Sequence, residues 1–100
     1  MKIKINILIV LIFVLIFSTL TNGQNVSNSV KAQALIQMQN GRYGEAIDLL
    51  NKYISAEPQK ADGYNLRALC YEQRGQFEQS VYDLRAARKI EPNNSEINRN

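Results

Sequence analysis

The chain contains no histidine, no tryptophan and a single cysteine among its 100 residues. The absence of histidine excludes catalytic triads and dyads with an imidazole base, and metal sites with imidazole ligands. One cysteine excludes an intramolecular disulfide and a site with several thiolate ligands. The sequence therefore predicts a non-catalytic protein without cofactor or metal, and it offers no catalytic, cofactor-binding or metal-binding residue.

The lone cysteine, Cys70, lies between Leu69 and Tyr71 in a segment with helical periodicity. Free cysteines are among the most frequently buried residues and behave as small hydrophobic side chains. Burial is the favoured interpretation, and a redox role or an intermolecular disulfide is the alternative.

After the first 23 residues, the chain also has almost no excess of positive or negative charge. The formal charge is +3, but Lys2 and Lys4 are two of the twelve basic residues and the first 23 residues carry no acidic one. The remainder therefore has a net charge of only +1. A small basic cluster, Arg85, Arg88 and Lys89, stands near the predicted end of a helix, where the dipole favours cations. We predict no nucleic-acid partner.

There is one long hydrophobic run, the eleven residues from Ile7 to Phe17. Lysines precede it and small polar residues follow, which is the layout of a secretory signal peptide over residues 1–23, with cleavage after Gly23. Export to a periplasm or out of the cell is the expectation. The alternative is an inner-membrane anchor over residues 3–20, although a span needs about 20 apolar residues. A retained leader should form one hydrophobic helix that does not pack on the domain.

A polar linker is expected at residues 24–27, and residues 28–94 hold two copies of one pattern, at 27–60 and 61–94. The copies are related by 34 residues without gaps. Identical residues are Ala34/Ala68, Leu35/Leu69, Gln39/Gln73, Gly41/Gly75, Leu50/Leu84, Glu57/Glu91 and Pro58/Pro92. Apolar periodicity predicts helices at 28–40, 44–57, 61–74 and 78–91.

Each repeated residue type has a mechanical role in the second copy. Tyr64, Ala68 and Tyr71 are spaced by four and three and so share one helix face. Gly75 suits a left-handed C-cap, and Phe77 is expected to be wedged between the two helices.

The second helix of this copy continues the pattern. Ser80, Leu84 and Ala87 recur at spacings of four and three, Ile90 closes the apolar face, and Pro92 ends the helix. Asp62 is expected to cap the preceding helix at its start. In the first copy the same roles fall to Val30, Ala34, Gly41, Tyr43, Ala46, Leu50, Tyr53 and Pro58.

This order of aromatic, small, aromatic, small and bulky apolar residues with a late proline resembles the tetratricopeptide repeat. The first copy departs from it at Val30, Gln37 and Tyr53. The resemblance implies an all-α helical-repeat solenoid, with two antiparallel helix-turn-helix repeats in a right-handed superhelical arrangement. It also implies a non-catalytic adaptor with a protein or peptide partner, in which the first helix of each pair lines a concave groove.

The register of the resemblance implies the groove residues. They are Asn28, Lys31, Leu35, Met38, Gln39, Asn65, Leu66, Leu69, Glu72 and Gln73. Some family members grip a C-terminal carboxylate there, and Lys31 matches one of their lysines. Leu35 and Leu66 replace two of their asparagines, so the sequence favours an apolar peptide or helix in the groove. The alternative is that Leu35 and Leu69 are core residues.

Residues 95–100 are expected to be the truncated start of a further helix or a C-terminal tail. Helical repeats gain stability from their neighbours, and three or more are usually needed. Val81, Leu84 and Ile90 should therefore lack a cover. Two alternative functions follow: a structural module that forms a homodimer through the 78–97 edge, and a membrane-anchored adaptor with its leader retained.

Overall fold

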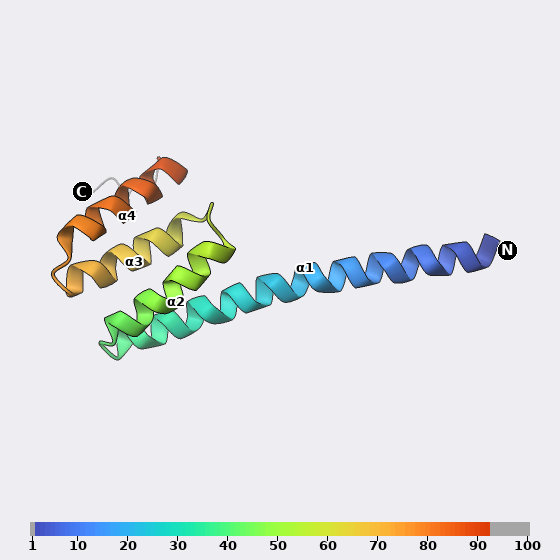
Figure 1. Cartoon of the computed structure of the whole chain (residues 1–100), viewed down its shortest axis with the longest axis horizontal. Coiled ribbons are helices and arrows are strands. Elements are labelled where there is room, and N and C mark those ends of the chain that lie inside the picture. The colour runs from blue at the N-terminus through green and yellow to red at the C-terminus, as the bar shows by residue number, and fades with distance from the viewer. Residues whose placement is uncertain (1, 93–100) are drawn as a thin grey trace.

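The computed structural model describes the backbone of residues 2–92 and the side chains of residues 6–16 and 25–92. The described chain consists of four helices and turns: α1 (Lys2–Gln39), α2 (Tyr43–Ala56), α3 (Ala61–Gln73) and α4 (Phe77–Ile90). Each helix packs on the next in the chain, and Figure 1 shows the resulting layered arrangement. The predicted all-α helical-repeat fold is confirmed. The residues expected at 95–100 lie outside the described part.

Both helical pairs turn at a glycine with a left-handed backbone. Gly41 has φ 73° and Gly75 has φ 74°. The N–H of Arg42 donates to the carbonyl of Gln37 at 2.8 Å, and the N–H of Gly41 donates to that of Met38 at 3.0 Å. This is the Schellman arrangement that satisfies the last carbonyls of a helix, and the same pattern recurs around Gly75. The sequence predicted these two turns, and α2, α3 and α4 begin and end within one residue of their predicted bounds.

The first helix differs from the prediction, because it does not start at residue 28. Residues 24–27, expected as a linker, are helical and continuous with the segment before them. Neither glycine nor proline interrupts residues 24–27, and Ser27 is only 2% exposed, so tertiary contact supports the helix there. The N-terminal part of α1 extends away from the other helices as a rod (Figure 1), and the described side chains at 6–16 are exposed.

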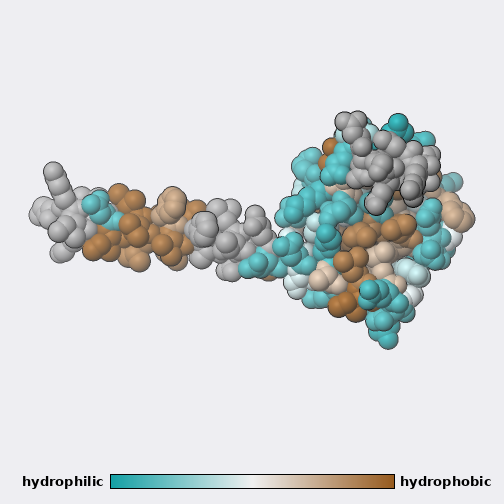
Figure 2. All heavy atoms as spheres, turned by 180° about the vertical axis from the view of Figure 1, so that it is seen from behind, coloured by the Kyte–Doolittle hydropathy of each residue, from teal (hydrophilic) through white to brown (hydrophobic). Residues whose placement is uncertain are grey.

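The apolar side chains that the structure describes on this rod are largely open to solvent. Those from Ile7 to Ile16 are between 52% and 70% exposed, and Figure 2 shows them as a hydrophobic band. Within the residues that the structure describes, no helix has a hydrophobic stretch long enough to cross a membrane.

The core lies where small residues allow the helices to approach closely. Ala34, Ala46, Leu50, Cys70 and Ile47 form its main cluster, against which Met38, Tyr43, Leu49, Leu66 and Tyr71 pack. A second cluster joins Ala61 and Ala87 with Tyr64 and Ile90. Ala68 and Ser80 are also buried.

The expectation that Phe77 is wedged between two helices is wrong. Its side chain is 64% exposed, whereas Tyr43, the same position in the first copy, packs on the main cluster. Tyr43 is covered because α3 follows α2. No helix of the described chain covers α4 in the same way.

Candidate functional site

A shallow cavity of about 410 Å³ opens beside the first turn of the domain. Leu35, Met38 and Gln39 line it from α1, Tyr43 from α2, and Leu69 and Gln73 from α3. Leu35 is 39% exposed and Leu69 is 45% exposed. Both leucines are therefore open to the cavity, and the alternative that they are core residues is wrong. Figure 2 shows hydrophobic residues gathered in a patch on one face of the domain, bordered by hydrophilic ones.

Five of the ten predicted groove residues share this cavity, and the other five do not line it. Asn28 and Glu72 are exposed elsewhere on the surface, and Asn65 is half-buried. Leu66 is half-buried and packs against the main core cluster, because its turn of α3 faces α2. Leu66 therefore does not line this cavity.

Tyr43 is the cavity residue that the sequence did not assign to the groove. Its place after Gly41 predicts only an elbow residue, which is a residue wedged between two helices where the chain turns. Its ring contacts the core and also lines the cavity. The signal that could have found it is its place two residues after Gly41, next to the end of α1 that carries Met38 and Gln39.

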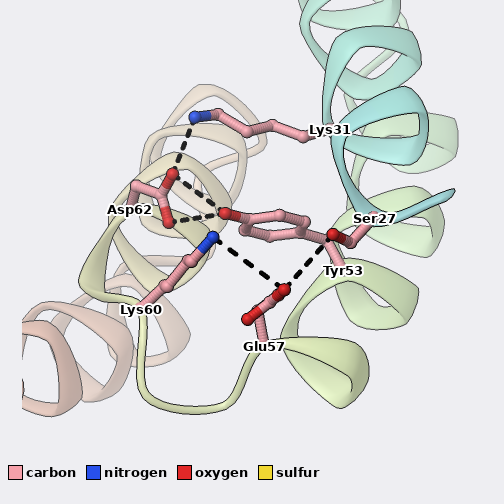
Figure 3. A network of polar contacts seen from close by, with 6 residues as sticks. All are labelled: Ser27, Lys31, Tyr53, Glu57, Lys60 and Asp62. Carbon is pink, nitrogen blue, oxygen red and sulfur yellow. Dashed lines mark hydrogen bonds and ion pairs between the residues drawn. The ribbon is translucent and has the colours of Figure 1, made fainter. Parts of the chain in front are cut away.

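Lys31, the remaining predicted groove residue, belongs to a network of charged groups instead (Figure 3). Its ammonium lies 2.7 Å from a carboxylate oxygen of Asp62. The hydroxyl of Tyr53 donates to the same carboxylate at 3.0 and 3.1 Å. The network therefore joins α1, α2 and α3. The ammonium of Lys31 therefore already has a carboxylate partner within the domain.

The network shifts the ionisation of its members. Burial, then the hydrogen bond to Asp62 and the negative charges of Asp62 and Glu57, raise the pKa of Tyr53 to about 12. Partial burial alone would raise the pKa of Asp62. The hydrogen bonds from Lys31 and Tyr53 and the charge of Lys31 outweigh it, so that this pKa is lowered. At neutral pH Asp62 is ionised and Tyr53 is protonated.

Asp62 does not cap α3, contrary to the prediction. Lys60 is the N-cap and makes no side-chain capping bond. Asp62 lies one residue inside the helix, where Tyr53 and Lys31 hold its carboxylate. On the other side of the network, Ser27 donates to Glu57 at 3.3 Å, and Lys60 lies 3.9 Å from the same carboxylate.

A second hollow, of about 670 Å³, is lined by Arg67 and Asp83, which form a largely buried ion pair. Arg67 of α3 donates from Nε and Nη2 to Asp83 of α4, both at 2.7 Å. Its Nη1 donates to Asn51 at 2.8 Å. The guanidinium also lies 5.8 and 5.9 Å from the ring centres of Tyr64 and Tyr71.

Asp83 is 1% exposed, and its hydrogen bond raises the pKa of Arg67. No feature of the repeat pattern indicates this pair. The first copy has Gln33 and Leu49 at the same positions, so the repeat pattern points to neither charge. The pair is a feature of the second repeat alone.

The remaining candidate for chemistry is Cys70, which is fully buried with a free thiol. Burial raises the pKa of this thiol, which keeps it protonated and unreactive. Among the residues that the structure describes, no group of acidic, histidine or cysteine side chains is arranged to hold a metal ion.

Comparison with known families agrees with this geometry. The tetratricopeptide repeat family matches at residues 32–60 and again at residues 61–94. The chain belongs to the tetratricopeptide repeat family. Among curated proteins, none matches the chain significantly. In the family's terms, the C-terminal part of α1 and α2 form the first tetratricopeptide repeat, and α3 and α4 form the second. Tetratricopeptide repeats are protein–protein interaction modules, so a protein partner is the general expectation.

Proposed function

We propose that this chain is a non-catalytic adaptor that holds an apolar peptide or helix in the cavity between its two repeats. The observation that carries the proposal is the exposure of Leu35 and Leu69 at that cavity. A partner that covers these side chains is stabilised by about 25 cal/mol for each Å² of apolar surface that binding removes from water.

The rim of the cavity suits a peptide backbone as well as apolar side chains. Gln39 and Gln73 bring amide groups that can donate and accept hydrogen bonds. None of the six lining residues is charged, so a charged partner terminus finds no counter-ion there. These features favour a partner that presents two or three apolar side chains in sequence.

Substitution of the two leucines tests the site. Leu35→Glu or Leu69→Glu places a carboxylate in the apolar cavity and should abolish capture of the partner from the cell fraction in which the chain accumulates. Because both side chains are already well exposed, helical content by circular dichroism should not change. Tyr82→Glu is the matched control, since Tyr82 is 73% exposed on α4, which contributes nothing to this cavity. Capture that survives both leucine variants would show that the cavity is not the site.

We also propose that the chain is exported and that residues 1–23 are removed. The order of lysines, apolar run and small polar residues supports this proposal. The described contacts also allow it. Among the side chains that the structure describes, those at 6–16 are exposed, and the buried residues of α1, Ser27 and Ala34, lie beyond residue 23. Removal of the leader would therefore leave the packed part of α1 in place.

Sequencing the N-terminus of the accumulated protein decides the fate of the leader. A chain that begins at Gln24 supports cleavage. A chain that begins at Met1 and fractionates with membranes would favour the anchored alternative.

A further inference from the structure

The two ends of the domain expose the same two faces that meet inside it. Inside, α3 packs on α2 through the main cluster, where Ile47 and Leu50 of α2 meet Cys70 of α3. These three side chains are 8%, 0% and 0% exposed. One repeat later on α4, the positions of Ile47 and Leu50 are occupied by Val81 and Leu84. Val81 is 46% exposed and Leu84 is only half-buried. Helix α4 therefore repeats the face with which α2 contacts α3, but no described helix packs on that face of α4.

The complementary face lies at the other end, on α1. One repeat earlier than Cys70 is Ile36, which is 54% exposed. Ala32 and Gln33 occupy the positions of Leu66 and Arg67 and are exposed as well. The surface with which α3 contacts α2 is therefore repeated on α1, where it is open to solvent.

We infer that α1 of a second copy packs on α4 as α3 packs on α2, so that copies stack head to tail. Ile36 of the second copy then lies against Val81 and Leu84. The stack continues the repeat array and covers the apolar flank at both ends. Helical repeats are stabilised by such neighbour contacts, and two repeats alone have only one of them.

Polar groups at the same register also match. Inside the domain, Arg67 of α3 donates to Asn51 of α2 at 2.8 Å. At the proposed contact, Gln33 of the second copy takes the place of Arg67, and Arg85 of α4 takes the place of Asn51. The guanidinium donor is then on α4 and the amide acceptor on α1 of the second copy, so the two groups remain complementary. Phe77, which is 64% exposed, takes the place of Tyr43. No like charges face each other at these positions.

A head-to-tail contact differs from a two-fold dimer in a way that can be measured. In a two-fold contact through α4, Val81 faces the same surface of the other copy. In the head-to-tail contact, Val81 faces Ile36 and never another α4. The two arrangements therefore predict different cross-links from the same residues.

Cysteine cross-linking of the full chain in the producing cells distinguishes them. Ile36→Cys and Val81→Cys chains with different tags are co-expressed and treated with a short bis-maleimide. Cys70 stays in place, and the unsubstituted chain gives its background because Cys70 is fully buried. A mixed dimer that forms only when both variants are present supports head-to-tail stacking. Dimers of Val81→Cys alone indicate the two-fold arrangement and overturn the inference. A Lys52→Cys chain, with its cysteine at an exposed position of α2, is the control, and the absence of any product above it also overturns the inference.

A disruptive variant gives a second test. Chains that carry both Ile36→Cys and Leu84→Cys should form a ladder of cross-linked oligomers. Adding Val81→Glu should reduce that ladder at least tenfold with unchanged helical content, because Val81 is already partly exposed in one copy. A ladder that persists would contradict the stacking. The Leu69→Glu variant should leave the ladder intact, so failure of the groove and failure of the stack are separable.

Discussion

The buried ion pair between Arg67 and Asp83 gives the sharpest prediction for stability. Asp83→Leu leaves the guanidinium of Arg67 without two of its three hydrogen bonds, both of 2.7 Å, and with Asn51 as its remaining partner. Breaking one side of a buried ion pair typically costs about 3–5 kcal/mol. The Arg67 side chain retains 17% exposure, which allows some rehydration. We therefore expect a loss of about 2–4 kcal/mol, enough to unfold much of a domain this small.

The first repeat supplies the matched control. At the same positions it has Gln33 and Leu49, so the double variant Arg67→Gln/Asp83→Leu copies a pairing that this fold already accommodates. The double variant should be more stable than Asp83→Leu alone, with a coupling energy on the order of 2 kcal/mol. Urea unfolding of the four proteins, followed by circular dichroism at 222 nm, measures this coupling. Additive effects of the two single substitutions would refute the reasoning.

Further predictions concern the polar network and the elbow positions. The pKa of Tyr53 is raised from 10.0 to about 12. The stability that its protonated hydroxyl contributes to the folded state is therefore fully present below pH 10 and is lost as the pH rises towards 12. The free energy of unfolding should therefore fall less at alkaline pH in Tyr53→Phe than in the unsubstituted protein, by on the order of 2 kcal/mol between pH 10 and 12, as measured by unfolding at each pH. The pKa of Asp62 is lowered, so its contribution is lost as the pH falls through and below the ordinary carboxylate range. Acid unfolding of Asp62→Asn should show a shallower pH dependence over that range. Phe77→Ala should cost less than about 1 kcal/mol in urea unfolding, and Tyr43→Ala about 3 kcal/mol, because only Tyr43 is packed. Equal costs would contradict the packing described for the two elbows.

The repeat pattern predicted what depends on contacts between residues close in sequence. The turns at Gly41 and Gly75 follow from the backbone freedom of glycine, and the C-terminal ends of α2 and α4 follow from Pro58 and Pro92. The buried alanines on the helix faces follow from the close approach of neighbouring helices. These features repeat because the same physical requirement repeats.

The pattern failed where the environments of the two copies differ. Phe77 and Tyr43 are similar residues at one register position, but only Tyr43 has a following helix to cover it. Arg67 and Asp83 replace an amide and a leucine, so their pairing depends on a contact between two helices that one sequence does not reveal. The register predicts Leu66 for the groove, whereas its half-buried side chain packs against the main core cluster and does not line the cavity.

The sequence predicts only half of the cavity, because contacts between helices are not visible in the repeat pattern. The sequence placed Leu35 and Leu69 on one surface, since they occupy the same position in two successive repeats. It could not show that Lys31 would be held by Asp62 and Tyr53, because Tyr53 stands where the family pattern has a small residue. The hydroxyl of Tyr53 is part of the network in Figure 3, and Lys31 belongs to that network and does not line the cavity.

Photo-cross-linking from inside the cavity tests the central claim most directly. A benzoyl-phenylalanine at position 69 projects from a half-exposed site on the cavity wall, and the same group at position 82 projects from α4. Irradiation of the producing cells should join position 69, but not position 82, to one discrete partner protein, and Leu35→Glu should abolish that product. A product of equal yield from both positions, or one that persists in the Leu35→Glu background, would contradict an interaction site at this cavity.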